Sequence, residues 1–85
     1  MTNMSKVEKM LEFIRNNPTN VRFDVLRNLL LHYGFEESAP GGGSSHRTFS
    51  RDMYRITIPK QNPVNEAYVK DVIKIIDELE KEKKK

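Results

Sequence analysis

Pro40 and the three glycines after it are expected to interrupt regular secondary structure near the middle of the chain. A helix interior tolerates neither residue type well, because proline lacks an N–H and clashes with the preceding turn, whereas glycine loses the most backbone freedom on folding. Up to Gly34 the apolar residues follow helical spacing, but the segments 47–51 and 54–58 alternate with a period of two. The chain is therefore expected to change from helices to a small sheet around this break.

Three segments have the spacing of amphipathic helices. The first starts with Ser5 and Glu8, the pattern of a capping box. The second covers about residues 23–33, and the following Gly34 suits the left-handed conformation that ends many helices. The third starts near Asn65 and has the strongest apolar stripe, which consists of Tyr68, Val69, Val72, Ile73, Ile76 and Leu79, with Ile75 widening it.

Three short segments have the features of strands. Residues 35–39 form the first, and residues 47–51 and 54–58 alternate with period two around Asp52 and Met53, which fit a tight antiparallel hairpin. The alternation predicts a buried face with Phe49, Ile56 and Ile58. It predicts an opposite, polar and cationic face with Thr48, Arg55 and Thr57, and with His46 at its end.

The predicted order is helix, helix, strand, strand, strand, helix. This order indicates an α+β fold in which helices pack on one face of a small three-stranded antiparallel sheet. The 85 residues leave room for one small domain. We expect residues 1–20 to form a helical extension, 21–79 the domain itself and 80–85 a disordered basic tail. We interpret the extension as a helix that adds to the core of a small domain. The alternative is that it forms a surface for a partner protein.

The positive charge of the chain is uneven. The formal net charge is +3, and residues 80–85 contribute +2 of it. Between residues 44 and 62, however, Arg47, Arg51, Arg55 and Lys60 face only Asp52, which leaves a local balance of +3 around His46. Such a cluster fits a nucleic-acid-binding surface, although it is also typical of an ordinary solvated face.

Several classes of function have no support in the sequence. The chain has no cysteine and only two distant histidines, so no metal site of the usual spacing is expected. It contains no apolar run of about 20 residues and no apolar segment of a secretory signal, so we expect a cytoplasmic protein without a membrane span. Paired carboxylates, a phosphate-binding lysine after the glycines and an ordered serine–histidine–acid set are also missing.

His46 is the candidate for chemistry, because an unperturbed histidine titrates near neutral pH. The glycines and serines before it have backbone N–H groups that can approach a phosphate. Cleavage of RNA requires deprotonation of a ribose 2′-hydroxyl, stabilisation of the phosphorane and protonation of the leaving oxygen, which one histidine with nearby cations can assist. The alternative to a catalytic role is a structural one. His46 is then an ordinary histidine at a strand edge, the glycines and serines before it form a linker, and the nearby arginines are solubilising charges.

The motifs VRFDVLRNLLLHYGFE, GSSHRTF, YRITIP and NPVNEAYVKDVIKII, which together span about residues 21–76, resemble in order the HicA family of bacterial toxins. The resemblance implies a fold like that of a double-stranded RNA-binding domain and an mRNA-cleaving endoribonuclease that needs no metal or other cofactor. It places His46 at the family's catalytic histidine, and Gly43 and Ser44 match the Gly-Ser before it. It also implies a HicB-type antitoxin protein as a partner.

The expected RNA-binding residues are Gly43, Ser44, Ser45, Arg47, Arg55 and Lys60. Two features depart from the family pattern: residues 39–42 are uncharged where many relatives have a cation, and Gln61 stands where relatives often have histidine. These departures motivate the alternative of a non-catalytic RNA-binding or protein-interaction module on the same fold. A third possibility is a structural partner whose outer helices pair with another subunit.

Overall fold

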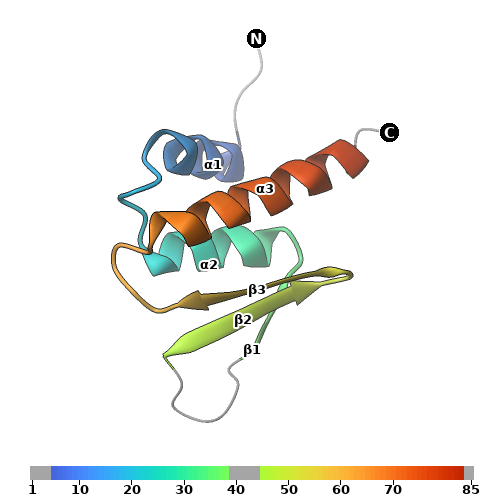
Figure 1. Ribbon diagram of the computed structural model, residues 1–85. Helices are drawn as coiled ribbons and strands as arrows, with labels where there is room; N and C mark the ends of the chain where they lie inside the picture. Colours follow the sequence, from blue (N-terminus) through green and yellow to red (C-terminus); the bar gives the residue numbers. More distant parts are fainter. Residues whose placement is uncertain (1–4, 39–44, 84–85) are drawn as a thin grey trace.

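The computed structural model describes residues 5–38 and 45–83. In these residues the helices and strands follow the predicted order (Figure 1): α1 (Lys6–Asn16), α2 (Phe23–His32), β1 (Glu36–Ser38), β2 (His46–Arg51), β3 (Tyr54–Pro59) and α3 (Glu66–Lys83). The sheet is antiparallel with the strand order β1-β2-β3. All three helices lie on one side of it, with α2 and α3 next to the sheet and α1 farthest away (Figure 1). The predicted α+β fold is confirmed.

Local signals in the sequence set the ends of two helices. Ser5 and Glu8 form the predicted capping box: the Glu8 N–H donates to Ser5 Oγ at 3.1 Å, and the Ser5 N–H donates to Glu8 Oε1 at 2.9 Å. At the end of α2, Gly34 has a φ of 89°, which suits glycine. The N–H groups of Gly34 and Phe35 donate to carbonyls of the last helical turn, so Phe35 folds back onto the helix and is buried.

The hairpin between β2 and β3 sets which side chains face the helices. Arg51 pairs with Tyr54 across a two-residue turn, in which Asp52 has a positive φ of 52°. Phe49 therefore lies opposite Ile56 on the side that faces the helices. The predicted buried residues Phe49, Ile56 and Ile58 are all buried, which confirms the predicted face.

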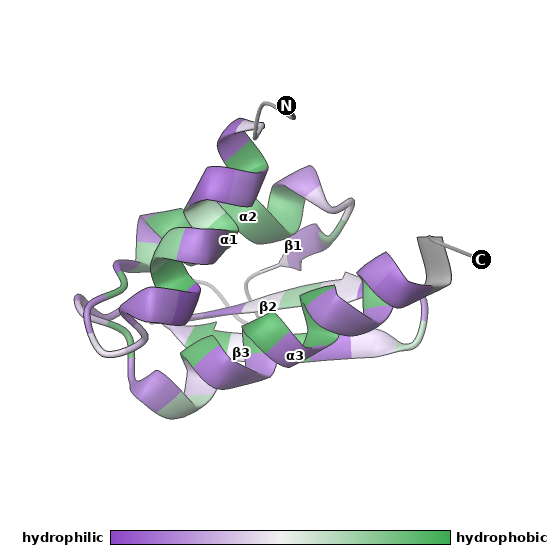
Figure 2. Cartoon of the chain, turned by 90° about the horizontal axis from the view of Figure 1, so that it is seen from above, coloured by the Kyte–Doolittle hydropathy of each residue, from purple (hydrophilic) through white to green (hydrophobic). Residues whose placement is uncertain are grey.

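One core joins all three helices to the sheet. Its buried members are Ile14, Val21, Phe23, Leu26, Leu29, Leu30, Phe35, Phe49, Ile56, Ile58, Val64, Val69, Val72, Ile76 and Leu79. Apolar and polar residues alternate along each helix, as expected for helices with one buried side (Figure 2). Ile14 of α1 is fully buried in this core, so α1 contributes to it.

The last helix is longer than the sequence predicts. Residues 80–85 were expected to form a disordered tail, but α3 continues to Lys83. One physical reason is that Glu80 is held by a tertiary contact: the Tyr33 hydroxyl donates a hydrogen bond to Glu80 Oε2 at 2.7 Å. The helix is therefore anchored to the end of α2 at the residue that directly follows Leu79, the last residue of α3 described as buried.

Substitution of Ile14 by alanine is expected to lower the free energy of unfolding by about 2–5 kcal/mol, because a fully buried isoleucine loses its transfer energy and leaves a cavity. Urea denaturation measures the change. Phe13→Ala on the same helix is the control, since the Phe13 side chain is 49% exposed. Equal effects of the two variants would contradict the assignment of α1 to the core.

Candidate functional site

His46 is the first residue of β2 and lies at one end of the sheet. It is exposed and pairs with Pro59 of β3. Alternation along the strand places its side chain on the face of the sheet that the helices leave open. Ser45 Oγ is 3.4 Å from His46 Nδ1, and the Lys60 N–H donates to the Ser45 carbonyl at 2.7 Å. The strand pairing therefore continues past His46 and keeps Ser45 and Lys60 next to it.

The open face beyond His46 is polar, as predicted. Thr48 and Thr57 pair across β2 and β3, and their hydroxyl oxygens are 3.0 Å apart. Thr48 is buried despite lying on this face, and the hydrogen bond with Thr57 satisfies its hydroxyl. This pair makes the centre of the face uncharged.

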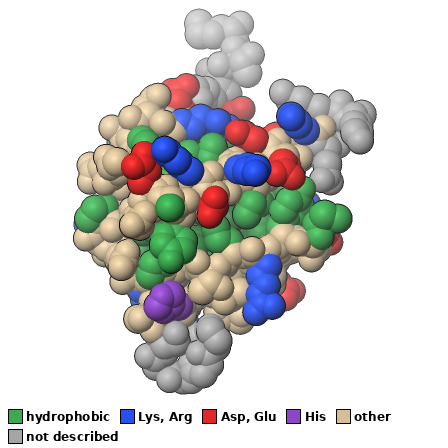
Figure 3. Space-filling view, in the orientation of Figure 1, with side chains coloured by type: hydrophobic (Ala, Val, Ile, Leu, Met, Phe, Trp, Pro, Cys, Tyr) green, Lys and Arg blue, Asp and Glu red, His purple; other side chains and the backbone are tan. Residues whose placement is uncertain are grey.

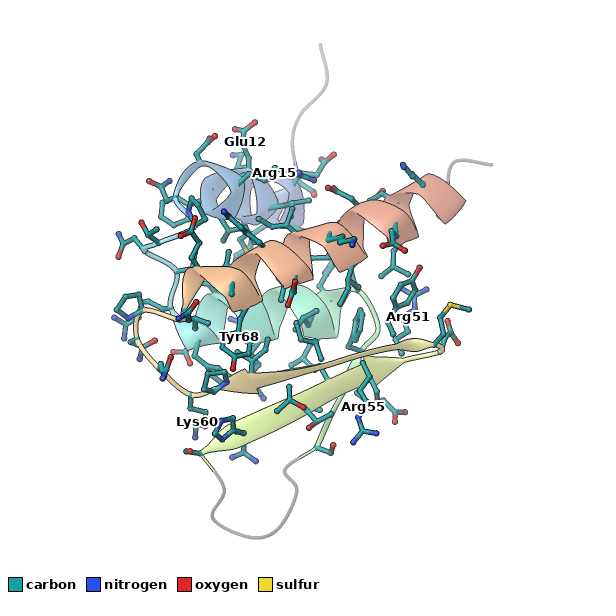
Figure 4. The ribbon with its side chains drawn as sticks, in the orientation of Figure 1. Glu12, Arg15, Arg51, Arg55, Lys60 and Tyr68 are labelled. Carbon is teal, nitrogen blue, oxygen red and sulfur yellow. The ribbon has the colours of Figure 1, made fainter. Side chains whose placement is uncertain are left out.

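Arg55 lies on the same face as His46 but far from it. It pairs with Ser50, which is four residues along β2 from His46, or about 13 Å. Figure 4 shows Arg55 and Lys60 toward different ends of the sheet. Glu36 of β1 also pairs with Ser50, so a carboxylate shares the row of Arg55. Arg55 therefore does not border His46, and Glu36 lies two strands away from Arg55 in the same row of the open face.

Arg47 points away from His46. As the next residue in β2, its side chain projects to the side of the sheet that faces the helices. There its Nε lies 3.8 Å from Glu37 Oε2. Arg51 is on the same side at the other end of β2 and donates from Nη1 to the Tyr33 carbonyl at 2.5 Å. The expectation that the arginines surround His46 is therefore corrected: the sheet divides them between its two faces.

A charged groove of about 470 Å³ lies on the helix side at the His46 end of the sheet. Its wall includes Arg47 and Lys60, which the sequence predicted as RNA-binding, together with Arg27 of α2 and Glu37 of β1. Arg27 Nε is 2.9 Å from Glu37 Oε1. Arg27 was missed by sequence reasoning, because nothing in its spacing along α2 indicates which strand residue it will meet.

The other expected RNA-binding residues are Gly43, Ser44 and Ser45. Gly43 and Ser44 lie outside the described residues, whereas Ser45 is exposed beside His46. In the ranges 5–38 and 45–83, no group of three histidine, cysteine or acidic residues has the arrangement of a metal site. None of the helices in these ranges is both long and apolar enough to span a membrane.

A second groove, of about 700 Å³, lies at the hairpin end of the sheet between the start of α1, the end of α2 and the end of α3. Ser5, Tyr33, Arg51 and Glu80 contribute to its wall. Burial, followed by the hydrogen bond to Glu80, raises the pKa of Tyr33 above its usual value. Tyr33 therefore keeps its proton and donates it in the hydrogen bond to Glu80.

The fold and the site define a small α+β protein. An exposed histidine lies at one end of its polar sheet face, and the groove lined by Arg27, Arg47 and Lys60 lies at the same end, on the helix side of the sheet. No protein-family model, curated protein or solved structure matches the chain. The resemblance to HicA toxins is therefore carried by the sequence motifs alone.

Proposed function

We propose that the chain is a HicA-like toxin, a cytoplasmic endoribonuclease that cleaves mRNA without a metal ion. The observation that carries the proposal is the position of His46, exposed at the end of the open sheet face with Ser45 and Lys60 beside it. The strand order and the helices on one face also support a fold like that of a double-stranded RNA-binding domain, with α1 added.

His46 acts as the general acid or base in this proposal. The ribose 2′-hydroxyl loses its proton and its oxygen attacks the adjacent phosphorus, after which the bond from phosphorus to the 5′-oxygen breaks and that oxygen takes up a proton. His46 exchanges one of these protons with the RNA. Lys60, whose backbone pairs with Ser45 next to His46, adds positive charge at this end of the sheet, while Arg55 binds a phosphate farther along the open face.

The test is incubation of purified protein with a long single-stranded RNA in the presence of a chelator. Cleavage products that accumulate with time are expected, and a gel resolves them. Intact RNA after prolonged incubation with folded protein would contradict the proposed activity.

A HicB-type antitoxin is the proposed protein partner. Expression of the chain alone is expected to arrest bacterial growth, and co-expression of the antitoxin is expected to restore it. Normal growth at high levels of folded protein would argue against a toxin.

A non-catalytic RNA-binding module is the second candidate, and Gln61 favours it because relatives often have histidine there. This candidate predicts RNA affinity that weakens with salt, without formation of products. Products formed by the wild type but not by a variant without His46 would exclude it.

A further inference from the structure

The groove at the His46 end of the sheet brings together three cations from separate parts of the chain. Arg27 comes from α2, Arg47 from β2 and Lys60 from the segment after β3. Two carboxylates, Asp24 and Glu37, also line the groove, so its charged groups leave a net charge of +1. By contrast, the face of α1 and α3 visible in Figure 3 has basic and acidic side chains interspersed. The groove is thus suited to an anion.

Glu37 organises the two arginines of this groove. Its carboxylate lies 2.9 Å from Arg27 Nε and 3.8 Å from Arg47 Nε, and its side chain is 21% exposed. The side chains of Arg27 and Arg47 keep 42% and 32% of their surface exposed, so both remain accessible to a ligand. One carboxylate shared by two guanidinium groups leaves a positive excess. It also limits their motion, which lowers the entropy lost on binding.

Backbone contacts join the groove to the candidate catalytic end. The Lys60 N–H is bonded to the Ser45 carbonyl, and Arg47 directly follows His46 in β2. The segment after Lys60 is fastened to the start of α2, because the Phe23 N–H donates to Asn62 Oδ1 at 2.9 Å. His46 and the groove therefore occupy the two faces of the same sheet end. Figure 4 shows Lys60 at this end of the sheet.

We propose that this groove binds a backbone phosphate of the RNA near the one that is cleaved, with Arg27, Arg47 and Lys60 as its cationic ligands. This inference deepens the proposed function and depends on RNA being the substrate. The RNA strand passes around the end of the sheet, from His46 on the open face toward α2. Guanidinium groups suit such a site because their planar N–H donors match phosphate oxygens.

An ion-pair cluster that only fastens β1 to α2 would need Arg27 and Glu37 alone. The presence of Arg47 and Lys60 in the same groove distinguishes the site from such a cluster. The competing ligand is an acidic protein segment, which the binding experiment below separates from RNA.

The experiment measures binding of a single-stranded oligoribonucleotide to full-length protein in the His46→Ala background, where the RNA stays intact. Arg27→Gln is expected to weaken binding about tenfold at low salt, as loss of a charged hydrogen bond would. It should also reduce the salt dependence of log Kd by about 0.7, the value for one phosphate contact to a single strand. Lys60→Gln should act in the same direction. Lys74→Gln, an exposed change on α3, is the control and should change neither quantity.

Glu37→Gln separates phosphate binding from a structural role. This variant breaks the same ion pair with Arg27 but removes a negative charge from the groove, so RNA affinity is expected to be retained or raised. Equal loss of affinity in Glu37→Gln and Arg27→Gln would overturn the proposal. The proposal would also be overturned if Arg27→Gln had the same RNA affinity and salt slope as Lys74→Gln. In that case an acidic protein segment would be the better ligand for the groove. Absence of RNA cleavage by the wild type would instead count against the proposed nuclease, independently of these slopes.

Discussion

His46→Ala is expected to lower the rate of RNA cleavage by about 10²–10⁴-fold, the usual contribution of a general acid or base. The imidazole lies at the exposed end of the open sheet face, where a phosphodiester can reach it. Alanine removes the group proposed to exchange a proton with the RNA but leaves the strand pairing between Ser45 and Lys60 intact, since that pairing uses backbone atoms. Rate constants under single-turnover conditions, with protein in excess over a labelled RNA, measure the effect.

The chain offers a matched control in its second histidine. His32 is also exposed, but it ends α2, where its ring makes an edge contact with Tyr33 at 5.8 Å between ring centroids. His32→Ala should retain the wild-type cleavage rate. Circular dichroism shows whether both variants are folded. A similar rate for the His46 and His32 variants, whether reduced or unchanged, would refute the assigned role of His46.

Phe49→Ala is expected to reduce the free energy of unfolding by about 3–5 kcal/mol. Phe49 is fully buried in the central strand, opposite Ile56, and its ring centroid is 6.4 Å from that of Phe23. Small domains have a total stability of about 5–15 kcal/mol, so this loss is a large share of the total. Urea denaturation followed by circular dichroism gives the change in unfolding free energy.

Met53→Ala is the control for this stability measurement. Met53 is in the turn that follows Phe49's strand, and its side chain is 87% exposed. Its replacement should change the unfolding free energy by less than about 0.5 kcal/mol, as for most surface substitutions. A loss below about 1 kcal/mol for Phe49→Ala would mean that β2 is not the centre of the core.

The elements of this fold were predictable because local signals and apolar periodicity agree with each other. Ser5 with Glu8 marks the start of α1, and Gly34 marks the end of α2. The turn at Asp52 and Met53 sets the register of β2 and β3, and hence the face on which His46 lies. The packing of α1 into the common core has no such signal, since an amphipathic helix can cover many surfaces.

The charges around His46 were harder to predict. Counting cations along the chain treats Arg47 and Arg55 as one patch, but strand alternation sends their side chains to opposite faces. The count also starts after the glycines, so it omits Glu37, which β1 brings next to Arg47, and Glu36, which lies in the same row of the sheet as Arg55. Arg27 joins the groove only through the packing of α2 on the sheet, and residue spacing cannot reveal that contact.

The arrangement of the two grooves sets where the protein can be attached to a surface or labelled. Ser5 and Glu80 line the groove at the hairpin end, beside Arg51. Arg51 and His46 stand at opposite ends of β2, five residues or about 17 Å apart. A fluorophore or immobilising linker introduced at Ser5 or Glu80 is therefore expected to leave the histidine end of the sheet accessible to large ligands.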